Sequence, residues 1–416
     1  MPETSATSDS DRPADSGDGR LHGGRSGSVR EVFGAFLKLG CTAFGGPIAH
    51  LGYFQNELVK RRRWIDEAMF ADTVALCQFL PGPTSSQVGL ALGWRRAGWR
   101  GAFAAWFAFT MPSTVLMLAF AYGVQLAGDL SHAGWVQGLK VAAVAVVAQA
   151  VWTMAKKLCP DVPRAAIALG ALAALLLMPQ QWMQIVVLVG GAAAGAMLIR
   201  WFKAEPVPAP GPVAVKRPTA GHALLSIFFV LLFLLPWLAR MWPVQWLQVF
   251  AGFFRAGSLV FGGGHVVLPL LERTTVARGW LDHDRFLAGY GAAQALPGPL
   301  FTFSAYLGAL IPPGGIGGGI LALIAIYLPT VLLVFGTLPQ WDHLRAAPQA
   351  RALLAGTNAA VVGLLAAAFC HPIWTSTIVD GKRFALMLAA YIGLEFWRIP
   401  PWLIVLACAL LGGLAS

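Results

Sequence analysis

Two cations, Lys38 and Arg255, lie inside otherwise apolar segments, each six residues before a Phe-Gly-Gly sequence. A cation at such a depth in a membrane is costly, so it usually faces a partner or an aqueous path. The alternative is that both side chains snorkel to the membrane surface. The placement predicts that both residues take part in the binding or passage of an anion.

Breaks rich in Gly and Pro follow each cation in the same order. Pro lacks a backbone N–H and Gly loosens the backbone, so these sequences interrupt a helix. Interrupted backbone at membrane depth is tolerated only where it lines a cavity or water, and half-helix N-termini offer N–H donors to an oxyanion. We therefore predict substrate binding or translocation by the cations, the breaks and their flanks: Lys38, Phe44, Gly45, Gly46, Pro47, Gln78, Pro81, Gly82, Pro83, Thr84, Ser85, Arg255, Phe261, Gly262, Gly263, Gly264, Gln294, Pro297, Gly298, Pro299 and Thr302.

Three further titratable residues are candidates for proton coupling: His50, Asp72 and His265. Histidine titrates near neutral pH, although a structural role is the alternative for both histidines. The five cysteines form no CxxC pair, and we find no nucleotide-binding or haem motif. The sequence therefore predicts no metal site, no cofactor and no catalytic residue.

The breaks belong to an internal repeat. Residues 33–51 match 250–268 at 7 of 19 positions, and 64–83 match 280–299 at 8 of 20. The repeat continues more weakly in Met111-Pro112-Ser113 against Leu328-Pro329-Thr330. Interrupted apolar segments at matching positions of two halves are typical of a transport site near the middle of a membrane.

The composition predicts an all-α polytopic membrane protein. Of the 416 residues, 57% are apolar and only 12% are charged, about half the charged fraction of a soluble protein. Apolar runs near 20 residues without alternation indicate helices in a lipid bilayer. The formal charge of +11 comes mostly from loops at the ends of these runs, which argues against a nucleic-acid partner.

Four regions follow from the composition along the chain. Residues 1–28 are predicted to be a disordered cytoplasmic tail, because they contain almost nothing to bury. The first repeat covers 29–202, a Pro-rich linker with one extra membrane span covers 203–247, and the second repeat covers 248–416.

The number of apolar segments predicts about 13 transmembrane spans. If each broken segment crosses once, seven crossings precede the second repeat, which makes the halves an inverted repeat with broken helices. With the N-terminus in the cytoplasm, inside loops hold 20 Lys and Arg against 7 outside. The cluster at 60–63 conflicts with this bias, and re-entry of the broken segments, which would return it inside, stays open.

The repeated blocks resemble the chromate ion transporter family in its long, two-domain form. The resemblance covers roughly 31–200 and 248–415. It implies a bacterial inner-membrane protein that exports chromate, with sulfate as a structural look-alike and competitor. The residues that carry it are Phe44-Gly-Gly-Pro47, Trp64-Ile-Asp66, Gln78-Phe-Leu-Pro-Gly-Pro83, Phe261-Gly-Gly-Gly-His265 and Gln294-Ala-Leu-Pro-Gly-Pro299.

The first hypothesis is thus a secondary transporter that works by alternating access around the broken segments. A carrier whose substrate is sulfate or another tetrahedral oxyanion is the nearest alternative. A membrane-embedded oxidoreductase would need an electron-carrying motif, and a membrane sensor would normally bring a soluble output domain. A homodimer is compatible with all of these readings.

Overall fold

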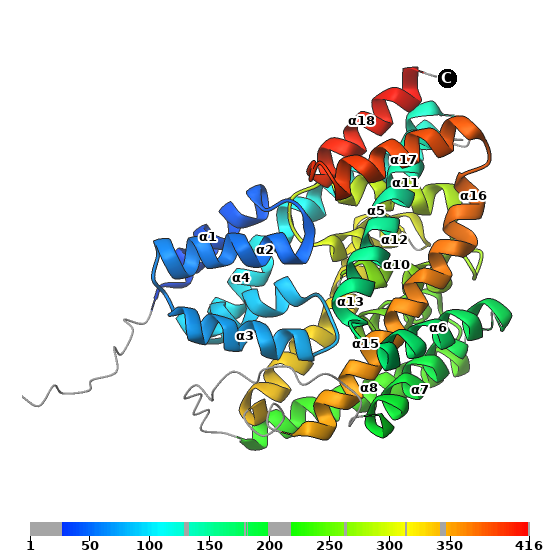
Figure 1. Cartoon of the computed structure of the whole chain (residues 1–416). Coiled ribbons are helices and arrows are strands. Elements are labelled where there is room, and N and C mark those ends of the chain that lie inside the picture. The colour runs from blue at the N-terminus through cyan, green and yellow to red at the C-terminus, as the bar shows by residue number, and fades with distance from the viewer. Residues whose placement is uncertain are drawn as a thin grey trace, which may run out of the picture.

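The protein is helical throughout the part of the chain that its computed structural model describes, namely residues 27–128, 133–178, 180, 182–198, 218–261, 264–312, 314–341 and 347–414 (Figure 1). Most of the predicted tail and of the Pro-rich linker lies outside these residues. The first repeat forms α1 (Val29–Thr42), α2 (Gly46–Phe54), η1 (Gln55–Arg61), α3 (Glu67–Phe79), α4 (Thr84–Ala127), α5 (Gly134–Leu158), α6 (Val162–Leu177) and α7 (Met183–Met197).

A separate helix, α8 (Pro218–Met241), joins the two repeats. The second repeat forms α9 (Gln245–Ser258), η3 (Gly264–Val266), α10 (Val267–Thr275), α11 (His283–Ala295), η4 (Leu300–Thr302), α12 (Phe303–Leu310), α13 (Gly315–Thr337), η5 (Leu338–Gln340), α15 (Pro348–Ala368), η6 (Phe369–Trp374), α16 (Thr375–Thr377), α17 (Gly381–Glu395) and α18 (Pro401–Leu414).

The first Gly-rich break turns the chain back on itself. Lys38 of α1 pairs with Glu57 of η1 at 3.2 Å, and the Trp64 indole donates to Glu31 near the start of α1 at 2.9 Å. Glu31 precedes Lys38, whereas its partner Trp64 follows Glu57, the partner of Lys38. The two segments therefore run in opposite directions, so α1 and the α2–η1 segment are antiparallel.

The other three breaks form hairpins of the same kind. Arg95 lies 3.2 Å from Met69 across the first Pro-Gly-Pro, so α3 is antiparallel to the first arm of α4. In the second repeat, α10 packs back on α9, and the Tyr306 hydroxyl of α12 donates to the Arg285 carbonyl of α11 at 2.7 Å. The assumption that each broken segment crosses the membrane once is therefore not supported.

Helix α4 is itself two helices. Ala97 and Gly98 have non-helical backbone angles, and Gly98 has a φ of 62°. Gly93 and Gly101 face each other across this turn without room for a side chain. The arm 84–96 thus completes the hairpin with α3, and the arm 99–127 is long enough to cross a membrane. By length and apolar composition, the described helices that qualify as spans include α4, α5, α8, α13 and α15.

The repeats interlock through small residues. Helix α5 of the first repeat packs against α17 and α18, the last two helices of the second, and α15 packs in the same way against α6 and α7. Gly138 meets Gly412 in one contact, and Gly356 meets Gly195 in the other. Figure 1 shows these two helix groups at the top and lower right, while α1, α2 and α3 form a block on the left.

Labelling with a membrane-impermeant maleimide tests the first hairpin. In a background in which the native cysteines are replaced by alanine, Ser28→Cys and Arg63→Cys are expected to react from the same side of the membrane, because the chain turns back at residues 43–46. Leu126→Cys, at the far end of the long arm of α4, serves as the control and is expected to react from the opposite side. Labelling of Ser28→Cys and Arg63→Cys from opposite sides would contradict the hairpin.

Candidate functional site

The four hairpin tips meet through a reciprocal pair of hydrogen bonds between the repeats. The Gly82 N–H of the first Pro-Gly-Pro donates to the Val260 carbonyl at 2.7 Å, and the Gly298 N–H of the second donates to the Ala43 carbonyl at 2.8 Å. Val260 and Ala43 occupy equivalent positions, one residue before the Phe-Gly-Gly sequences. Each Pro-Gly-Pro break thus donates a hydrogen bond to a free carbonyl at the interrupted helix end of the other repeat.

The remaining break residues lie around this crossing. Gly45 and Gly46 have positive φ values of 95° and 78°, and Pro47 starts α2. A Cβ on Gly264 would lie 3.4 Å from Pro47, its equivalent in the first repeat. The Phe44 ring packs on Trp402 of α18. Gly262 and Gly263 lie outside the described residues, and their neighbour Phe261 is partly buried.

The two central glycines have no room for a side chain. Gly82 has a φ of 127°, and a Cβ there would lie 2.7 Å from Gln87 Nε2 and 3.0 Å from Thr330 Oγ1. Gly298 has a φ of 96°, and a Cβ there would lie 2.9 Å from Ser113 Oγ. Ser113 and Thr330 are themselves equivalent residues of the weaker Pro-containing block.

Buried polar atoms without a hydrogen-bond partner gather beside the first Pro-Gly-Pro. They belong to five side chains that are 0–2% exposed: Ser86, Gln87, Thr110, Tyr327 and Thr330. The Tyr327 hydroxyl lies close enough to Ser86 and Thr110 to interact with them, but no hydrogen bond of standard geometry links these hydroxyls within the described part of the chain. Buried polar groups are normally paired, so this cluster is an exception that needs a reason.

Around the second Pro-Gly-Pro the hydroxyls are paired. Thr302 donates to the Pro299 carbonyl at 3.0 Å, and Ser304 donates to the Phe301 carbonyl at 2.7 Å. Both side chains are fully buried. Among the described residues, the unpaired hydroxyls therefore lie beside the first Pro-Gly-Pro, although Thr110 and Tyr327 are equivalent residues of the two repeats.

The candidate proton-coupling residues have separate partners. His50 Nδ1 lies 3.2 Å from Ser85 Oγ, and His265 Nδ1 lies 2.9 Å from the Tyr290 hydroxyl. Asp72 accepts a hydrogen bond from the Trp341 indole at 3.0 Å. The structure thus brings His50 to the first break but does not bring the three groups together.

The other predicted residues lie in or beside the two Pro-Gly-Pro breaks. Gln78 is exposed, Gln294 is partly buried with an unpaired Nε2 among the described residues, and Thr84 opens α4. Pro81 accepts a hydrogen bond from Gln87 at 2.7 Å. The other flanking prolines of the two breaks are Pro83, Pro297 and Pro299.

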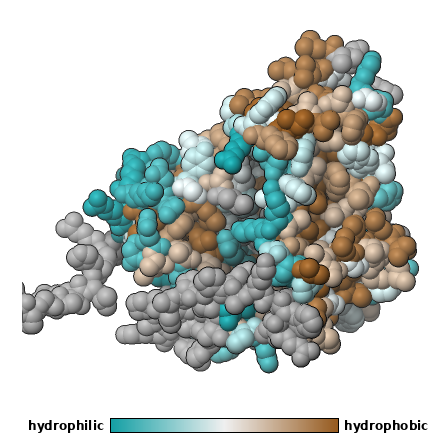
Figure 2. Space-filling view, viewed as in Figure 1, coloured by the Kyte–Doolittle hydropathy of each residue, from teal (hydrophilic) through white to brown (hydrophobic). Residues whose placement is uncertain are grey.

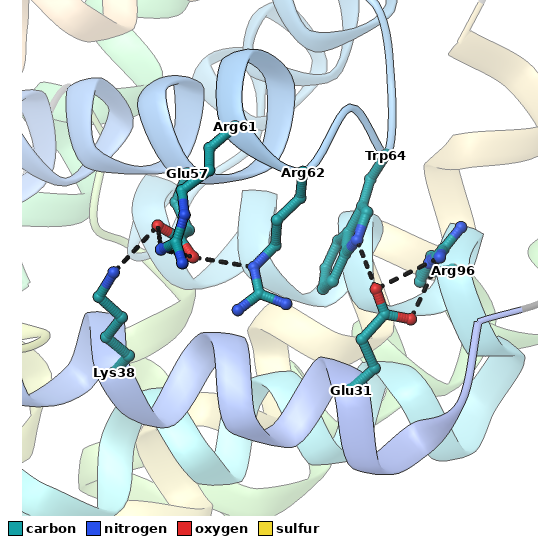
Figure 3. Close-up of polar contacts among 7 residues, drawn as sticks. All are labelled: Glu31, Lys38, Glu57, Arg61, Arg62, Trp64 and Arg96. Atoms are coloured by element: carbon teal, nitrogen blue, oxygen red, sulfur yellow. Dashed lines mark hydrogen bonds and ion pairs between the residues drawn. The ribbon is translucent and has the colours of Figure 1, made fainter.

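Lys38 belongs to a charged cluster around Glu57 (Figure 3). The Glu57 carboxylate accepts hydrogen bonds from Lys38 at 3.2 Å, Arg61 at 2.8 Å and Arg62 at 2.8 Å. Burial alone would raise the pKa of Glu57, but the bonds from Arg62, Arg61 and Lys38 outweigh it and lower the pKa from 4.5 to about 2. Glu57 is therefore a permanent anion at physiological pH.

A second ion pair fixes the base of the same hairpin. Arg96 lies 3.1 Å from Glu31 and also stacks over the Trp64 ring at 5.4 Å. Sequence reasoning identified Lys38 but missed Glu57, Arg61 and Arg62 as its setting, because the partner in a hairpin depends on where the chain turns. In Figure 2 hydrophilic side chains gather over this block, whereas hydrophobic ones cover the helices on the right.

An open groove lies between α2 and α3 in this block. Its volume is about 500 Å³, and its lining includes Leu51, Gln55, Glu67, Phe70 and Val74. The groove combines apolar walls with a carboxylate and an amide. No group of three or more potential metal ligands occurs among the residues that the structure describes.

Arg255 has different neighbours from Lys38. It is partly buried in the last turn of α9, and the described residues whose charges act on it are Arg278 and Arg240. Arg278 stacks over the Trp280 ring at 5.0 Å. The structure thus places Lys38 and Arg255 in two separate clusters.

Comparison with known proteins gives a consistent result. A family model described as "Chromate transporter" matches residues 30–196 and 247–413. The chain is 27% identical to a probable chromate transport protein of Synechococcus elongatus, over 95% of this chain and 98% of that protein. It is 27% and 25% identical to chromate transport proteins of Pseudomonas aeruginosa (82% of this chain, 80% of that protein) and Cupriavidus metallidurans (95% of each). No solved structure matches.

The crossing glycines are tested by alanine. Gly82→Ala and Gly298→Ala are each expected to destabilise the purified protein by about 1–3 kcal/mol, because alanine at a positive φ is strained and its Cβ meets the opposite repeat. Gly34→Ala is the matched control, since no atom lies within 4 Å of a Cβ there. Thermal unfolding in detergent measures the difference, and equal stability of all three variants would contradict the tight crossing.

The Glu57 cluster predicts a defined pH dependence. Glu57→Gln is expected to lower the free energy of unfolding by about 2 kcal/mol, because the hydrogen bonds between charged groups are weakened or lost. The loss is not larger because Lys38 and Arg61 are half exposed, and solvent already screens their interaction with Glu57. Folding lowers the pKa of Glu57, so its carboxylate stabilises the folded state. The stability difference between the native protein and Glu57→Gln is therefore complete above about pH 4.5 and declines as the pH falls toward about 2. Unfolding curves across this range measure it, with Glu67→Gln as control. An advantage that does not change below pH 4.5 would contradict the lowered pKa.

Proposed function

Because this chain belongs to the chromate transporter family, we propose that it exports chromate across the bacterial inner membrane through the crossing of its four hairpins. The observation that carries the proposal is the group of unpaired buried hydroxyls beside Gly82, which belong to Ser86, Thr110, Tyr327 and Thr330. Chromate is a tetrahedral dianion with four acceptor oxygens. Hydroxyl, amide and helix N-terminal N–H groups bind such an ion without a fixed countercharge.

The first arm of α4 supports this assignment. It begins at Thr84, directly after Pro-Gly-Pro, and Ser86 and Gln87 lie in its first turn. The N–H groups of a first helical turn have no intrahelical partner and carry partial positive charge. An oxyanion at this point would meet these N–H groups together with the hydroxyls of Thr110, Tyr327 and Thr330.

The hydrogen bonds between the repeats support a mechanism of alternating access. Gly82 to Val260 and Gly298 to Ala43 hold the hairpin tips together on both sides of the crossing. Breaking one of the two bonds would separate one pair of tips and leave the other closed. Since the two contacts are equivalent, the repeats provide two similar gates around one site.

The topology that fits this mechanism has nine crossings, with the four hairpins re-entrant. The crossings are the long arm of α4, α5, α6, α7, α8, α13, α15, α17 and α18. Five of them precede α9, an odd number, so the repeats are still inverted. With the N-terminus inside, Lys60 to Arg63 return to the cytoplasmic side while Arg273, Arg278 and Arg285 move outside, so the excess of inside cations persists.

Vesicle transport tests the function. Inside-out vesicles are expected to accumulate labelled chromate when a membrane potential or a pH gradient is imposed, and excess sulfate is expected to reduce the accumulation. Vesicles without the protein are the control. Sulfate accumulation without chromate accumulation would assign the chain to another oxyanion, and no energised accumulation of either would contradict export.

Tyr327→Phe tests the site. Removing an unpaired buried hydroxyl is expected to leave stability equal or higher, because the group has no partner to lose. The same change is expected to reduce chromate transport at least about tenfold, since one donor to the ion is worth about 1.5–3 kcal/mol. Tyr122→Phe, at an exposed hydroxyl of α4, is the control. Full transport by Tyr327→Phe would remove this hydroxyl from the site.

A further inference from the structure

The second repeat contains the cations of the Glu57 cluster without its carboxylate. Residues 33–51 align with 250–268 at a constant offset, so Lys38 corresponds to Arg255. The Trp64 N–H donates to the Leu58 carbonyl at 2.8 Å, and the Trp280 N–H donates to the Thr275 carbonyl at 3.0 Å. Leu58 therefore corresponds to Thr275, at the same offset as Lys38 to Arg255. Trp64 corresponds to Trp280 at an offset smaller by one, so the first repeat has one extra residue between Leu58 and Trp64.

This alignment assigns Thr274 to the position of Glu57. Arg278 corresponds to Arg62 of the Glu57 cluster, since each lies two residues before the equivalent Trp and stacks over its ring, at 5.0 Å and 5.7 Å. Leu58 and Thr275, which follow Glu57 and Thr274, are both fully buried, in agreement with the alignment. Where the first repeat places a carboxylate among cations, the second repeat places a neutral threonine.

The contacts of Thr274 agree with this equivalence. Its methyl group packs on Gly252 of α9, at a point where a larger residue than glycine would not fit. Arg255 lies three residues further along α9, on the same side of the helix. Thr274 and Arg255 thus lie near each other across the α9–α10 hairpin, as Glu57 and Lys38 do across the first hairpin.

Among the described residues, the two charges that act on Arg255 are both positive. Arg278 comes from the base of the same hairpin, where its stacking on Trp280 restricts its guanidinium, and Arg240 comes from the end of α8. Within the described ranges, none of these three arginines forms an ion pair with a carboxylate. Three cations near one another without a counter-ion favour the binding of an anion.

We propose that Arg240, Arg255 and Arg278 bind the oxyanion substrate at the place where the first repeat holds its own Glu57 carboxylate. Arginine presents paired N–H donors that match the oxygens of a tetrahedral dianion. In the first repeat the Glu57 carboxylate accepts hydrogen bonds from Lys38, Arg61 and Arg62. An oxyanion in the second repeat would take the place of this carboxylate. Arg240 and Arg278 are exposed, so the site is open to solvent and receives or releases the ion at one mouth of the pathway.

The inference rests on the proposed function for the identity of the ion, but the site is tested by binding. Thr274→Glu supplies the missing carboxylate and is expected to weaken sulfate and chromate binding at least tenfold. Thr274→Gln, of the same size but neutral, is expected to bind like the native protein, and Arg255→Gln is expected to lose binding. The measurement is the anion-induced rise in melting temperature of purified protein, against sodium chloride at equal ionic strength.

Several outcomes would overturn the site. Equal binding by the native protein and Thr274→Glu would show that no anion uses the Glu57-equivalent position. Weakened binding by Thr274→Gln as well would assign the effect to size rather than charge. If phosphatidylglycerol vesicles, but neither sulfate nor chromate, stabilise the native protein in an Arg255-dependent way, the arginines bind a lipid headgroup instead.

Transport separates failure of the site from failure of the function. Normal chromate accumulation by vesicles that contain Thr274→Glu would reject the arginine site and leave chromate export in place. Tight, Thr274→Glu-sensitive sulfate binding by a protein that accumulates no chromate would uphold the site and reject chromate export.

Discussion

Every interrupted backbone segment within a membrane must find its hydrogen-bond partners inside the protein, and this constraint accounts for the central feature of the fold. Gly-Gly and Pro-Gly-Pro sequences interrupt four helices and leave carbonyls and N–H groups without intrahelical partners. The structure satisfies them across the repeats, from Gly82 to Val260 and from Gly298 to Ala43. Each repeat thus supplies a hydrogen-bond partner to a break of the other, and α5 and α15 also pack on the opposite repeat, so the two halves depend on each other.

The two repeats use one scaffold for different electrostatic purposes. In the first, Glu57 neutralises part of the charge of Lys38, Arg61 and Arg62 and holds the hairpin closed. In the second, Thr274 occupies that position and the arginines keep their charge. The donors at the crossing are asymmetric too, since Thr302 and Ser304 are paired while Ser86 is not. The two repeats of a transporter face opposite sides of the membrane, where the ion is bound on one side and released on the other. Different charges and donors in the two repeats are consistent with these two tasks.

Much of this organisation could be predicted from the sequence. The repeat, the positions of the breaks and the all-helical membrane class follow from residue types and spacing, and the family follows from the same blocks. The direction of the chain after each break could not be predicted, because Phe44-Gly45-Gly46 allows both a kink and a reversal. Glu57 was missed for that reason, and Thr110 and Tyr327 were missed because single polar residues in long apolar runs give no signal until the crossing places them together.

The central claim is that the hairpin tips must separate for the ion to pass. The most direct measurement uses Pro47→Cys combined with Gly264→Cys, whose positions are in contact between the repeats. Oxidation is predicted to link the two cysteines and stop chromate transport, and reduction is predicted to restore it to the level of the reduced variant. Undiminished transport by fully cross-linked protein would contradict the account.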